Sequence, residues 1–395
     1  MTEPTIPRNA WIALAAGFLV LFVGGGSRFV IGLTLKPMVD EFGWPRSELG
    51  LTVGVFQVVS AVCMFAAGRM ADRLSNRLVL GCGLVFSGIG IGAMSLVQEP
   101  WHAMGLFGIL FAIGSGTAST TTVGVMITRV FARRTGLANA FVTSGTSMGQ
   151  LLMIAASTAV LTQIGWRYVF VGLGLLHVVL VPLLLFGIPG AAQNAARRAE
   201  PAAAGLSVRD AMRTRQFWLL IVIYSVCGFD DFFVATHVVA FAQDRGVDSF
   251  LAGNLLAAMG FTAWLGVVAV GAWSDRIGPA PGTAASFMAR VAVFGLIAVD
   301  QSPLSVTIFA LVFGATFFMT APLTILFVRD AFGMKNLGAL TGLITMAHHI
   351  FGGLGAYLGA RIFDATGTYD SAFVIMLIAS IVAVLATFGL RRHPA

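Results

Sequence analysis

Long apolar runs constrain the fold of this chain more than any other feature of its sequence. A helix needs about 20 apolar residues to cross the hydrocarbon core of a bilayer. Twelve runs of this kind can be drawn along the 395 residues. They cover residues 11–35, 47–67, 78–97, 102–127, 136–163, 167–188, 217–242, 249–272, 282–300, 303–328, 337–363 and 371–390. Because transmembrane β-strands are short and alternate with a period of two, these continuous runs predict an all-α integral membrane protein with twelve transmembrane helices.

Composition and cysteine usage support the membrane class. Only 10% of the residues are charged and 57% are hydrophobic, whereas a soluble domain carries about 25% charged residues. A chain with so little polar surface cannot cover its apolar mass in water. Its three cysteines each fall in a predicted span, without a CxxC or another metal-ligating spacing. We interpret them as packing residues and expect neither a metal site nor a cofactor.

The basic residues are distributed unevenly along the chain. If both termini lie in the cytoplasm, 17 of the 24 Lys and Arg residues fall in cytoplasmic segments, 5 in outside loops or at the outer ends of spans, and 2 deeper within spans. This is the positive-inside bias of membrane proteins. Orientation in the membrane thus explains the formal net charge of +7, and we expect no nucleic-acid partner. The expected location is the cell (inner) membrane, in a multi-pass arrangement with both termini cytoplasmic.

A stretch rich in Ala, Arg and Pro at 189–215 divides the spans into two groups of six. This composition is typical of linkers and surface helices. We expect an N-terminal six-helix bundle over 1–188, a cytoplasmic central loop over 189–215 and a C-terminal six-helix bundle over 216–395.

The two halves repeat each other. GRMADR at 68–73 recurs as GAWSDR at 271–276, an offset of 203 residues, and Phe170 recurs as Phe373 at the same offset. A third match, around Gly136 and Gly338, has an offset of 202. Matches in the same order at nearly one offset indicate a duplicated six-helix unit and two pseudo-symmetric bundles. Parallel repeats of this kind build transporters whose substrate site lies near the membrane midplane.

Several features resemble the major facilitator superfamily. The twelve spans, the 6+6 repeat, the long central loop and the G-x-x-x-D-R motif after the second span are similar to that family over nearly the whole chain. The resemblance implies that the motif and its repeat gate the cytoplasmic side, and the alternative is a solvated basic loop. The gating residues would be Gly68, Asp72, Arg73, Asp275 and Arg276.

Two further stretches, LKPMVDEFGWPRSELG at 35–50 and ARIFDATGTYDSAF at 360–373, resemble the monocarboxylate and oxalate/formate branch of that superfamily. Members of this branch move small organic anions, often together with a proton. The chain departs from the branch in the eighth span, where Ala263 and Val267 stand in place of an Asp and an Arg. In the eleventh span, two histidines stand in place of a lysine. The usual anion clamp of the branch is therefore not carried over.

Few ionisable residues lie within the predicted spans, where a charge is costly unless it faces a cavity or a partner. Asp230 and Asp231 lie near the middle of the seventh span, and the repeat offset relates them to Arg28 in the first. We expect Arg28 and one aspartate to lie at matching depth and to face each other across or near a central cavity. Arg28 would bind an anionic substrate and Asp230 or Asp231 would take up a proton, because two adjacent carboxylates in a low dielectric cannot easily both stay ionised.

The alternative for this pair is a fixed ion pair that only holds the halves in register. The glycines at 24–26 precede Arg28 and make the first helix thin, so that a neighbouring helix or a ligand can approach it closely. Arg290 in the ninth span has no assigned role; it either snorkels or pairs with a carboxylate.

Uncharged polar residues and one histidine complete the predicted substrate site. By the repeat offset His349 matches Ser147, and Thr143, Ser147 and Gln150 share one helix face. We expect these four residues and Gln57 to bind substrate, and His349 to act as a proton ligand as well. The alternative is a hydrogen bond to a neighbouring helix or to the residue's own backbone. A zinc site at His348 and His349 is not expected, because ligands on one helix face are three or four residues apart.

The sequence contains no P-loop and no H-E-x-x-H motif, so neither ATP-driven work nor metalloprotease chemistry is expected. We expect a monomeric secondary active transporter and not an enzyme. It would carry a small monocarboxylate-like organic anion by proton-coupled symport and alternating access. The alternative within the same fold is an exporter or exchanger of other small amphipathic organic compounds. A membrane enzyme or a sensor that does not transport is the alternative from another class.

Overall fold

The computed structural model describes residues 8–73, 75–130, 135–187, 205–333 and 335–390. These residues are almost entirely helical, and within these ranges the only β-type pairing is an isolated bridge between Gly205 and Gly333. The first half contains α1 (Arg8–Phe42), α2 (Arg46–Arg73), α3 (Asn76–Ala93), η1 (Met94–Leu96), α4 (Pro100–Ala103), η2 (Met104–Phe111), α5 (Ala112–Thr117), α6 (Thr120–Val130), α7 (Thr135–Ile164) and α8 (Trp166–Gly187). The second half contains α9 (Val208–Ala211), α10 (Arg215–Asp244), α11 (Ser249–Ile277), α12 (Pro279–Val299), α13 (Pro303–Phe317), α14 (Thr320–Phe332), α15 (Leu337–Thr366) and α16 (Asp370–Phe388).

Apart from some run ends and the two breaks described below, the twelve apolar runs fall on helices within the described residues. Among the described residues, ten helices are long and apolar enough to cross a membrane, and Pro303–Phe317 is a shorter apolar helix. The eleventh run lies on α15, which has 30 residues but contains six glycines and two histidines that lower its hydropathy. The prediction of an all-α membrane protein is confirmed.

Contacts within the chain define two compact units. One consists of residues 1–30 and 59–199, and the other of residues 31–58 and 200–395. The second unit therefore includes the C-terminal part of α1 and the N-terminal part of α2 in addition to the helices from α9 onward. The expected boundaries, 1–188 and 216–395, assign 31–58 to the N-terminal bundle and remain a prediction. The expected central loop, 189–215, falls largely outside the described residues.

The repeat is visible in how the helices pack inside each unit. In the first unit, a Cβ added at Gly25 of α1 would clash with the carbonyl oxygen of Thr146 on α7. In the second unit, a Cβ added at Gly228 of α10 would clash with the carbonyl oxygen of His348 on α15. The two glycines are 203 residues apart and their partners 202. Each half thus has a glycine at the equivalent position where two helices come into backbone contact.

A second repeated feature is a break in one helix of each half. α5 ends at Thr117 and α6 begins at Thr120, and α13 ends at Phe317 and α14 begins at Thr320. The two breaks are 200 residues apart, close to the repeat offset. Backbone groups freed by a break inside a membrane must find partners in the protein, so such breaks mark places where polar side chains are needed.

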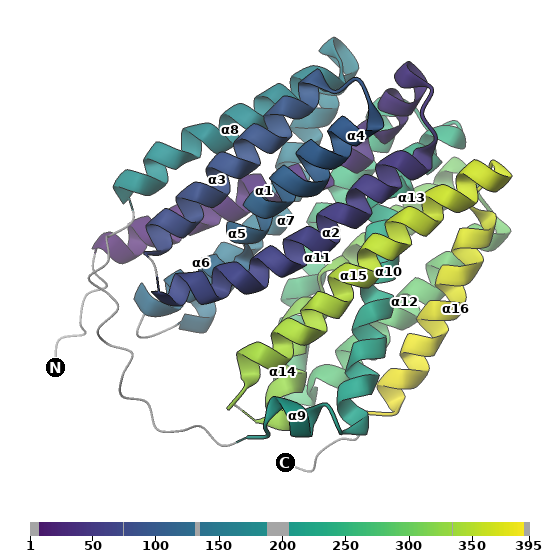
Figure 1. Ribbon diagram of the computed structural model, residues 1–395. Coiled ribbons are helices and arrows are strands. Elements are labelled where there is room, and N and C mark those ends of the chain that lie inside the picture. Colours follow the sequence, from purple (N-terminus) through teal and green to yellow (C-terminus); the bar gives the residue numbers. More distant parts are fainter. Residues whose placement is uncertain (1–7, 74, 131–134, 188–204, 334, 391–395) are drawn as a thin grey trace. The chain divides into compact units, whose positions relative to one another are not determined.

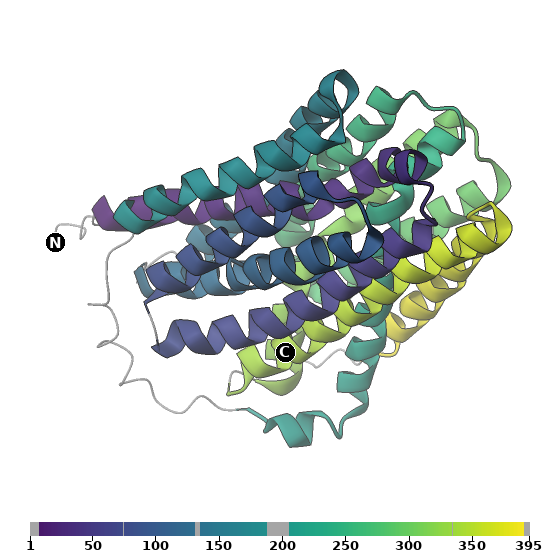
Figure 2. The same ribbon diagram turned by 45° about the horizontal axis from the view of Figure 1, so that its top comes forward.

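In the second unit, α10 packs along α15 and also contacts α11 and α16, while α12 packs against α13 and α16. Figure 1 shows α10 and α15 side by side, and the neighbouring α15 and α16 remain adjacent in the turned view of Figure 2. The central part of α10 is therefore enclosed by other helices. Nearly all of its residues from Ile223 to Ala242 are buried, including two aspartates.

Candidate functional site

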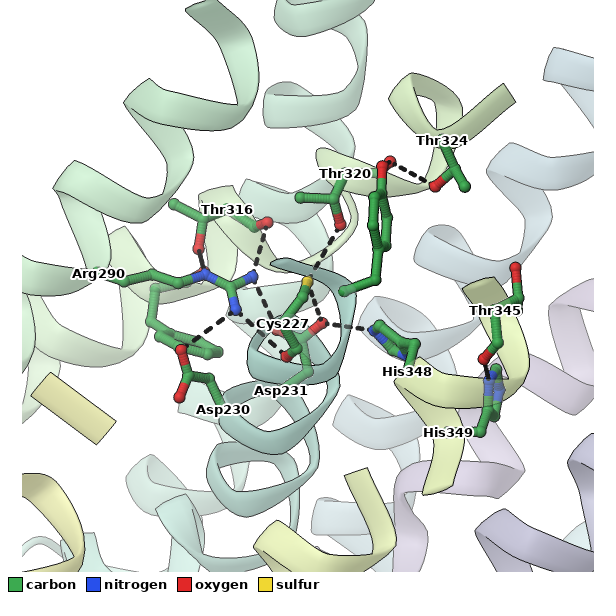
Figure 3. Close-up of polar contacts among 12 residues, drawn as sticks. Cys227, Asp230, Asp231, Arg290, Thr316, Thr320, Thr324, Thr345, His348 and His349 are labelled. Carbon is green, nitrogen blue, oxygen red and sulfur yellow. Dashed lines mark hydrogen bonds and ion pairs between the residues drawn. The ribbon is translucent and has the colours of Figure 1, made fainter. Parts of the chain in front are cut away.

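A buried cluster of charges joins side chains of α10 and α12. Asp230 and Asp231 of α10 are buried, and so is Arg290 of α12. Nη2 of Arg290 lies 2.8 Å from Oδ1 of Asp231, and Nη1 lies 3.8 Å from Oδ2 of Asp230 (Figure 3). Arg290, which the sequence left without a role, is thus the partner of both aspartates. One guanidinium is shared between two carboxylates, and Asp231 holds it more closely.

The last turns of α13, together with α10 and α12 itself, provide the rest of the Arg290 environment. Nε donates to Oγ1 of Thr316 at 3.1 Å, and Nη2 donates to the carbonyl oxygen of Thr316 at 3.2 Å. Nη1 donates to the carbonyl oxygen of Cys227 at 3.4 Å. The guanidinium also lies over the rings of Phe287 and Phe313, at 5.2 and 4.8 Å from their centroids. Hydrogen bonds and cation–π contacts together make a fully buried arginine tolerable.

The other carboxylate oxygen of Asp231 faces a thiol and an imidazole. The thiol of Cys227, one helical turn earlier on α10, donates to Oδ2 at 3.4 Å. Nε2 of His348 on α15 lies 3.3 Å from the same oxygen. Oγ1 of Thr320, the first residue of α14, lies 3.1 Å from the sulfur. Figure 3 shows these side chains converging from α10, α14 and α15.

Asp230, about 100° around α10 from Asp231, contacts α16 instead of α15. Its Oδ2 accepts a hydrogen bond from the hydroxyl of Ser380 on α16 at 2.9 Å. Its Oδ1 is buried and has no hydrogen-bond partner among the described residues. Because Arg290 lies 1 Å farther from Asp230 than from Asp231, the ionised form of Asp230 is less well compensated. Asp230 is therefore the carboxylate better placed to accept a proton.

The net charge of this cluster sets its chemistry. With both carboxylates ionised and His348 neutral, two negative charges face one positive charge, and the sum is −1. A single uncompensated charge in a buried site is costly. Uptake of one proton by either carboxylate brings the sum to zero. Binding of a single proton is therefore enough to balance the buried charges of this cluster.

The predicted residues of the first unit lie in different environments. Arg28 is half-buried, with its guanidinium 5.4 Å from the ring centroid of Phe29. On α7, Ser147 and Gln150 are buried whereas Thr143 is exposed. Arg28 and the aspartates belong to different units. Their expected apposition across a cavity therefore remains a prediction.

Gln57 on α2 belongs to the second unit and is fully buried. Within the part of the chain that the structure describes, neither the oxygen nor the nitrogen of its amide has a hydrogen-bond partner. A buried amide without partners is costly, and a polar ligand would satisfy it. Its expected role in substrate binding remains a prediction.

The two adjacent histidines have different partners. His348 contacts Asp231, whereas Nδ1 of His349 lies 2.9 Å from the carbonyl oxygen of Thr345, one turn earlier on its own helix. The sequence analysis preferred His349 as a ligand. The structure brings His348, and not His349, to the buried carboxylates, while the substrate role of His349 remains a prediction.

The predicted gating residues lie on described helices, but their side chains do not belong to the described part of the structure. α2 contains Gly68, Asp72 and Arg73, and α11 contains Asp275 and Arg276. Gating by these residues remains a prediction.

A second charged cluster, which we call the Arg46 cluster, was not predicted. It consists of Lys36, Arg46, Asp244, Asp364 and Tyr369. Arg46 pairs with Asp244 at 2.8 Å and donates to the hydroxyl of Tyr369 at 2.8 Å. Lys36 pairs with Asp244 at 3.2 Å. Asp364 accepts hydrogen bonds from the backbone N–H groups of Arg46 and Ser47 at the start of α2.

The Arg46 cluster joins the two stretches that carry the branch resemblance. Lys36 and Arg46 lie in 35–50, and Asp364 and Tyr369 lie in 360–373. Burial raises the pKa of the Tyr369 phenol above its ordinary value, and Arg46 opposes that shift. Tyr369 therefore stays protonated at physiological pH, with Arg46 donating to its oxygen. The sequence signal was available in the two motifs, but nothing in it indicated that they touch.

The fold and the buried ion cluster define a polytopic membrane transporter built on a repeated bundle. The sequence profile of the Major Facilitator Superfamily matches residues 17–235 and 222–395, and the chain belongs to that family. It is therefore a transporter and not an enzyme.

Individual proteins agree with this assignment. The chain is 26% identical to "Uncharacterized MFS-type transporter YcxA" of Bacillus subtilis (strain 168), covering 92% of this chain and 91% of that protein. It is 25% identical to human (Homo sapiens) "Monocarboxylate transporter 11", covering 92% and 79% of the two chains. It is 23% identical to "Oxalate:formate antiporter" of Oxalobacter formigenes, covering 97% and 92%. The branch resemblance is thereby confirmed.

Solved structures support the twelve-helix fold. A crystal structure of the nucleoside transporter NupG matches with a TM-score of 0.75 at 15% identity, covering 97% of this chain and 99% of that one.

Proposed function

We propose that this chain is a proton-coupled symporter of a small, monocarboxylate-like organic anion. It would work as a monomer in the inner membrane with both termini in the cytoplasm. The observation that carries the proposal is the buried cluster of Asp230, Asp231 and Arg290, whose charges sum to zero only after one proton is bound. Relatives named as monocarboxylate and oxalate:formate carriers support the choice of a small anion.

Proton coupling would operate through the two aspartates. Asp230 is the weaker partner of Arg290 and would bind and release the proton. Asp231 would hold Arg290 in place and link the site to His348, which is 18% exposed at its side chain.

Anion binding would use the polar residues predicted from the repeat. Arg28 would attract the substrate carboxylate, for which the guanidinium offers paired donors. Hydrogen-bonding side chains would complete the site: Gln57, Thr143, Ser147, Gln150 and His349. Gln57 has the clearest need for a ligand, because its buried amide lacks hydrogen bonds within the described ranges.

Alternating access would open and close the Arg46 cluster. Residues 31–58 of α1 and α2 pack with the second unit, and the remaining residues of these helices belong to the first. Arg46 lies on α2 of the N-terminal half and Asp244 on α10 of the C-terminal half, so rocking of the two six-helix halves would break the Arg46–Asp244 pair on one side of the membrane. The loop residues Gly68, Asp72, Arg73, Asp275 and Arg276 would make the corresponding contacts on the cytoplasmic side.

An exporter or exchanger of other small amphipathic compounds is the second candidate. The observation in its favour is that two positions of α11 carry apolar residues. Ala263 is fully buried there and Val267 is half-buried. Charged residues stand at these positions in the branch that the sequence resembles. A more apolar path would suit larger, less charged substrates.

Uptake into proteoliposomes tests the anion assignment. A panel of labelled carboxylates is offered with and without an inward proton gradient, to the wild type, to Arg28→Ala and to Arg361→Ala. Arg361 is exposed near the end of α15 and serves as a matched loss of one arginine. We expect gradient-driven uptake of a small acid that is retained in the Arg361 variant and lost in the Arg28 variant. Absence of carboxylate flux under every gradient would leave the second candidate.

A further inference from the structure

Three potential metal ligands converge beside Arg290. Cys227 and Asp231 are one turn apart on α10, and His348 reaches them from α15. The sulfur, a carboxylate oxygen and an imidazole nitrogen all lie within 4.8 Å of one another. Sequence spacing could not reveal this set, because its third member comes from a helix more than 100 residues away. Figure 3 shows the three side chains directed at the same small region.

Two of the three donor separations match a tetrahedral metal site. The Cys227 sulfur lies 3.4 Å from Oδ2 of Asp231, and Nε2 of His348 lies 3.3 Å from the same oxygen. Zinc bonds of about 2.0–2.3 Å at tetrahedral angles give donor separations of about 3.3–3.6 Å. The remaining edge, from the sulfur to the nitrogen, needs only a small movement of the imidazole, which is the most exposed of the three groups at 18%.

The surroundings hold the ligands in place. Arg290 contacts Oδ1 of Asp231 at 2.8 Å, which leaves Oδ2 directed at the thiol and the imidazole. A hydrogen-bonded carboxylate of this kind is a common outer-shell feature of metal sites. Oγ1 of Thr320 lies 3.1 Å from the sulfur. It would either donate to the thiolate or approach the fourth coordination position.

Charge balance favours a divalent ion. Metal binding replaces the thiol proton, which leaves to solvent, so that Cys227 and both aspartates contribute three negative charges. Arg290 and a divalent ion contribute three positive charges, and the buried cluster becomes neutral. The combination of thiolate, imidazole and carboxylate suits zinc and similar transition metals, whereas magnesium and calcium prefer oxygen ligands alone.

We propose that Cys227, Asp231 and His348 form a binding site for one zinc-type divalent transition-metal ion. The ion would enter from the side of His348, whose side chain is the most exposed of the three ligands.

Cobalt(II) binding to the purified full-length protein in detergent tests the site. Cys63→Ser and Cys82→Ser are introduced first, so that Cys227 is the only thiol. We expect one Co²⁺ per chain, with a thiolate-to-cobalt absorption band in the near ultraviolet and tetrahedral bands in the visible range. Zinc should displace the cobalt, and magnesium should not.

Three variants locate the ligands. Cys227→Ser should abolish the thiolate band. His348→Ala should weaken cobalt binding at least about tenfold, because even loss of an outer-shell partner costs 10–100-fold. His349→Ala, which removes the adjacent histidine, should retain the band and the affinity. Thermal unfolding of each variant without metal checks that it is folded. Absence of a thiolate band in the folded parent, or its persistence in folded Cys227→Ser, would overturn the proposal.

Discussion

At the scale of single residues, Arg290 organises the interior of the second unit. It contacts both aspartates, the carbonyl oxygen of Cys227, and the hydroxyl and carbonyl oxygens of Thr316 at the end of the broken helix. Five polar groups from two neighbouring helices therefore depend on one side chain. Loss of its charge would leave two carboxylates facing each other in a buried site, which is worse than having no charges there at all.

Arg290→Met should accordingly lower the free energy of unfolding by about 3–5 kcal/mol, the usual cost of removing one partner of a buried ion pair. The measurement is denaturant unfolding in detergent. Arg361→Ala, an exposed control, should change stability by less than about 0.5 kcal/mol.

Removing all three charges together gives a sharper test. Combining Arg290→Met with Asp230→Asn and Asp231→Asn should restore part of the lost stability, because no uncompensated charge remains. If the triple variant is less stable than Arg290→Met alone, the cluster is not held together by charge compensation.

The residue scale also shows what sequence reasoning could not resolve. Asp230 and Asp231 were identified because charges in apolar spans are rare, but Arg290 was left without a partner. The repeat offset relates equivalent positions, not contacting ones, so it drew attention to Arg28 instead. The offset is also uncertain by one residue, between 202 and 203. One residue rotates a side chain by about 100° around a helix, which is enough to favour His349 over His348.

At the scale of elements, close helix crossings and helix breaks position the cluster. Gly228 lets α10 approach α15 so closely that a Cβ there would clash with a backbone carbonyl oxygen. That approach brings His348 of α15 to the face of α10 that carries Asp231. The run lengths predicted the helices, but the breaks at 118–119 and 318–319 were not predicted, because no proline lies at either point.

Gly228→Ala tests the crossing. The added methyl group must push backbone away from backbone, and overpacking of this kind costs about 1–3 kcal/mol. Gly295→Ala on α12 is the matched control, because a Cβ at Gly295 meets nothing within 4 Å. The control should be neutral or gain up to about 1 kcal/mol from its better helix propensity. Equal effects of the two substitutions on thermal unfolding would contradict the packing argument.

The connection between α12 and α13 contains a pH-dependent element, because α12 ends at Val299 and leaves Asp300 beyond the span. The carboxylate of Asp300 accepts hydrogen bonds from the hydroxyl of Ser305 and from the backbone and hydroxyl of Ser302. These bonds, with that from Ser305 the largest cause, lower the pKa of Asp300 from its ordinary value. Its contribution to stability is therefore complete above its unfolded-state pKa of about 3.9 and is lost as the pH falls through the lower folded-state value.

Asp300→Asn should show this sign directly. The stability difference between wild type and variant should be constant above about pH 5 and should shrink as the pH falls below about 4. Thermal unfolding across a pH series measures it. A difference that grows with acidification would mean that Asp300 is not stabilised as a carboxylate.

At the scale of the whole molecule, duplication of a six-helix unit explains the structural features that the two halves share. Both halves share a glycine-mediated crossing and a broken helix at nearly the same offset. The second half differs by placing Asp230, Asp231 and Arg290 in its interior. Family, span number and repeat were accessible from sequence because they depend on hydropathy and local motifs. The partners in each polar cluster depend on side-chain directions between helices and were not.

Proton movement driven by substrate tests the central claim most directly. Proteoliposomes with a pH-sensitive dye inside receive a transported carboxylate from outside, with no imposed gradient. We predict that the lumen acidifies with the wild type and with Asp330→Asn, an exposed control. Acidification should disappear in the Asp230→Asn, Asp231→Asn double variant, while exchange of labelled for unlabelled substrate continues. Undiminished acidification in that variant would contradict proton coupling at the buried cluster.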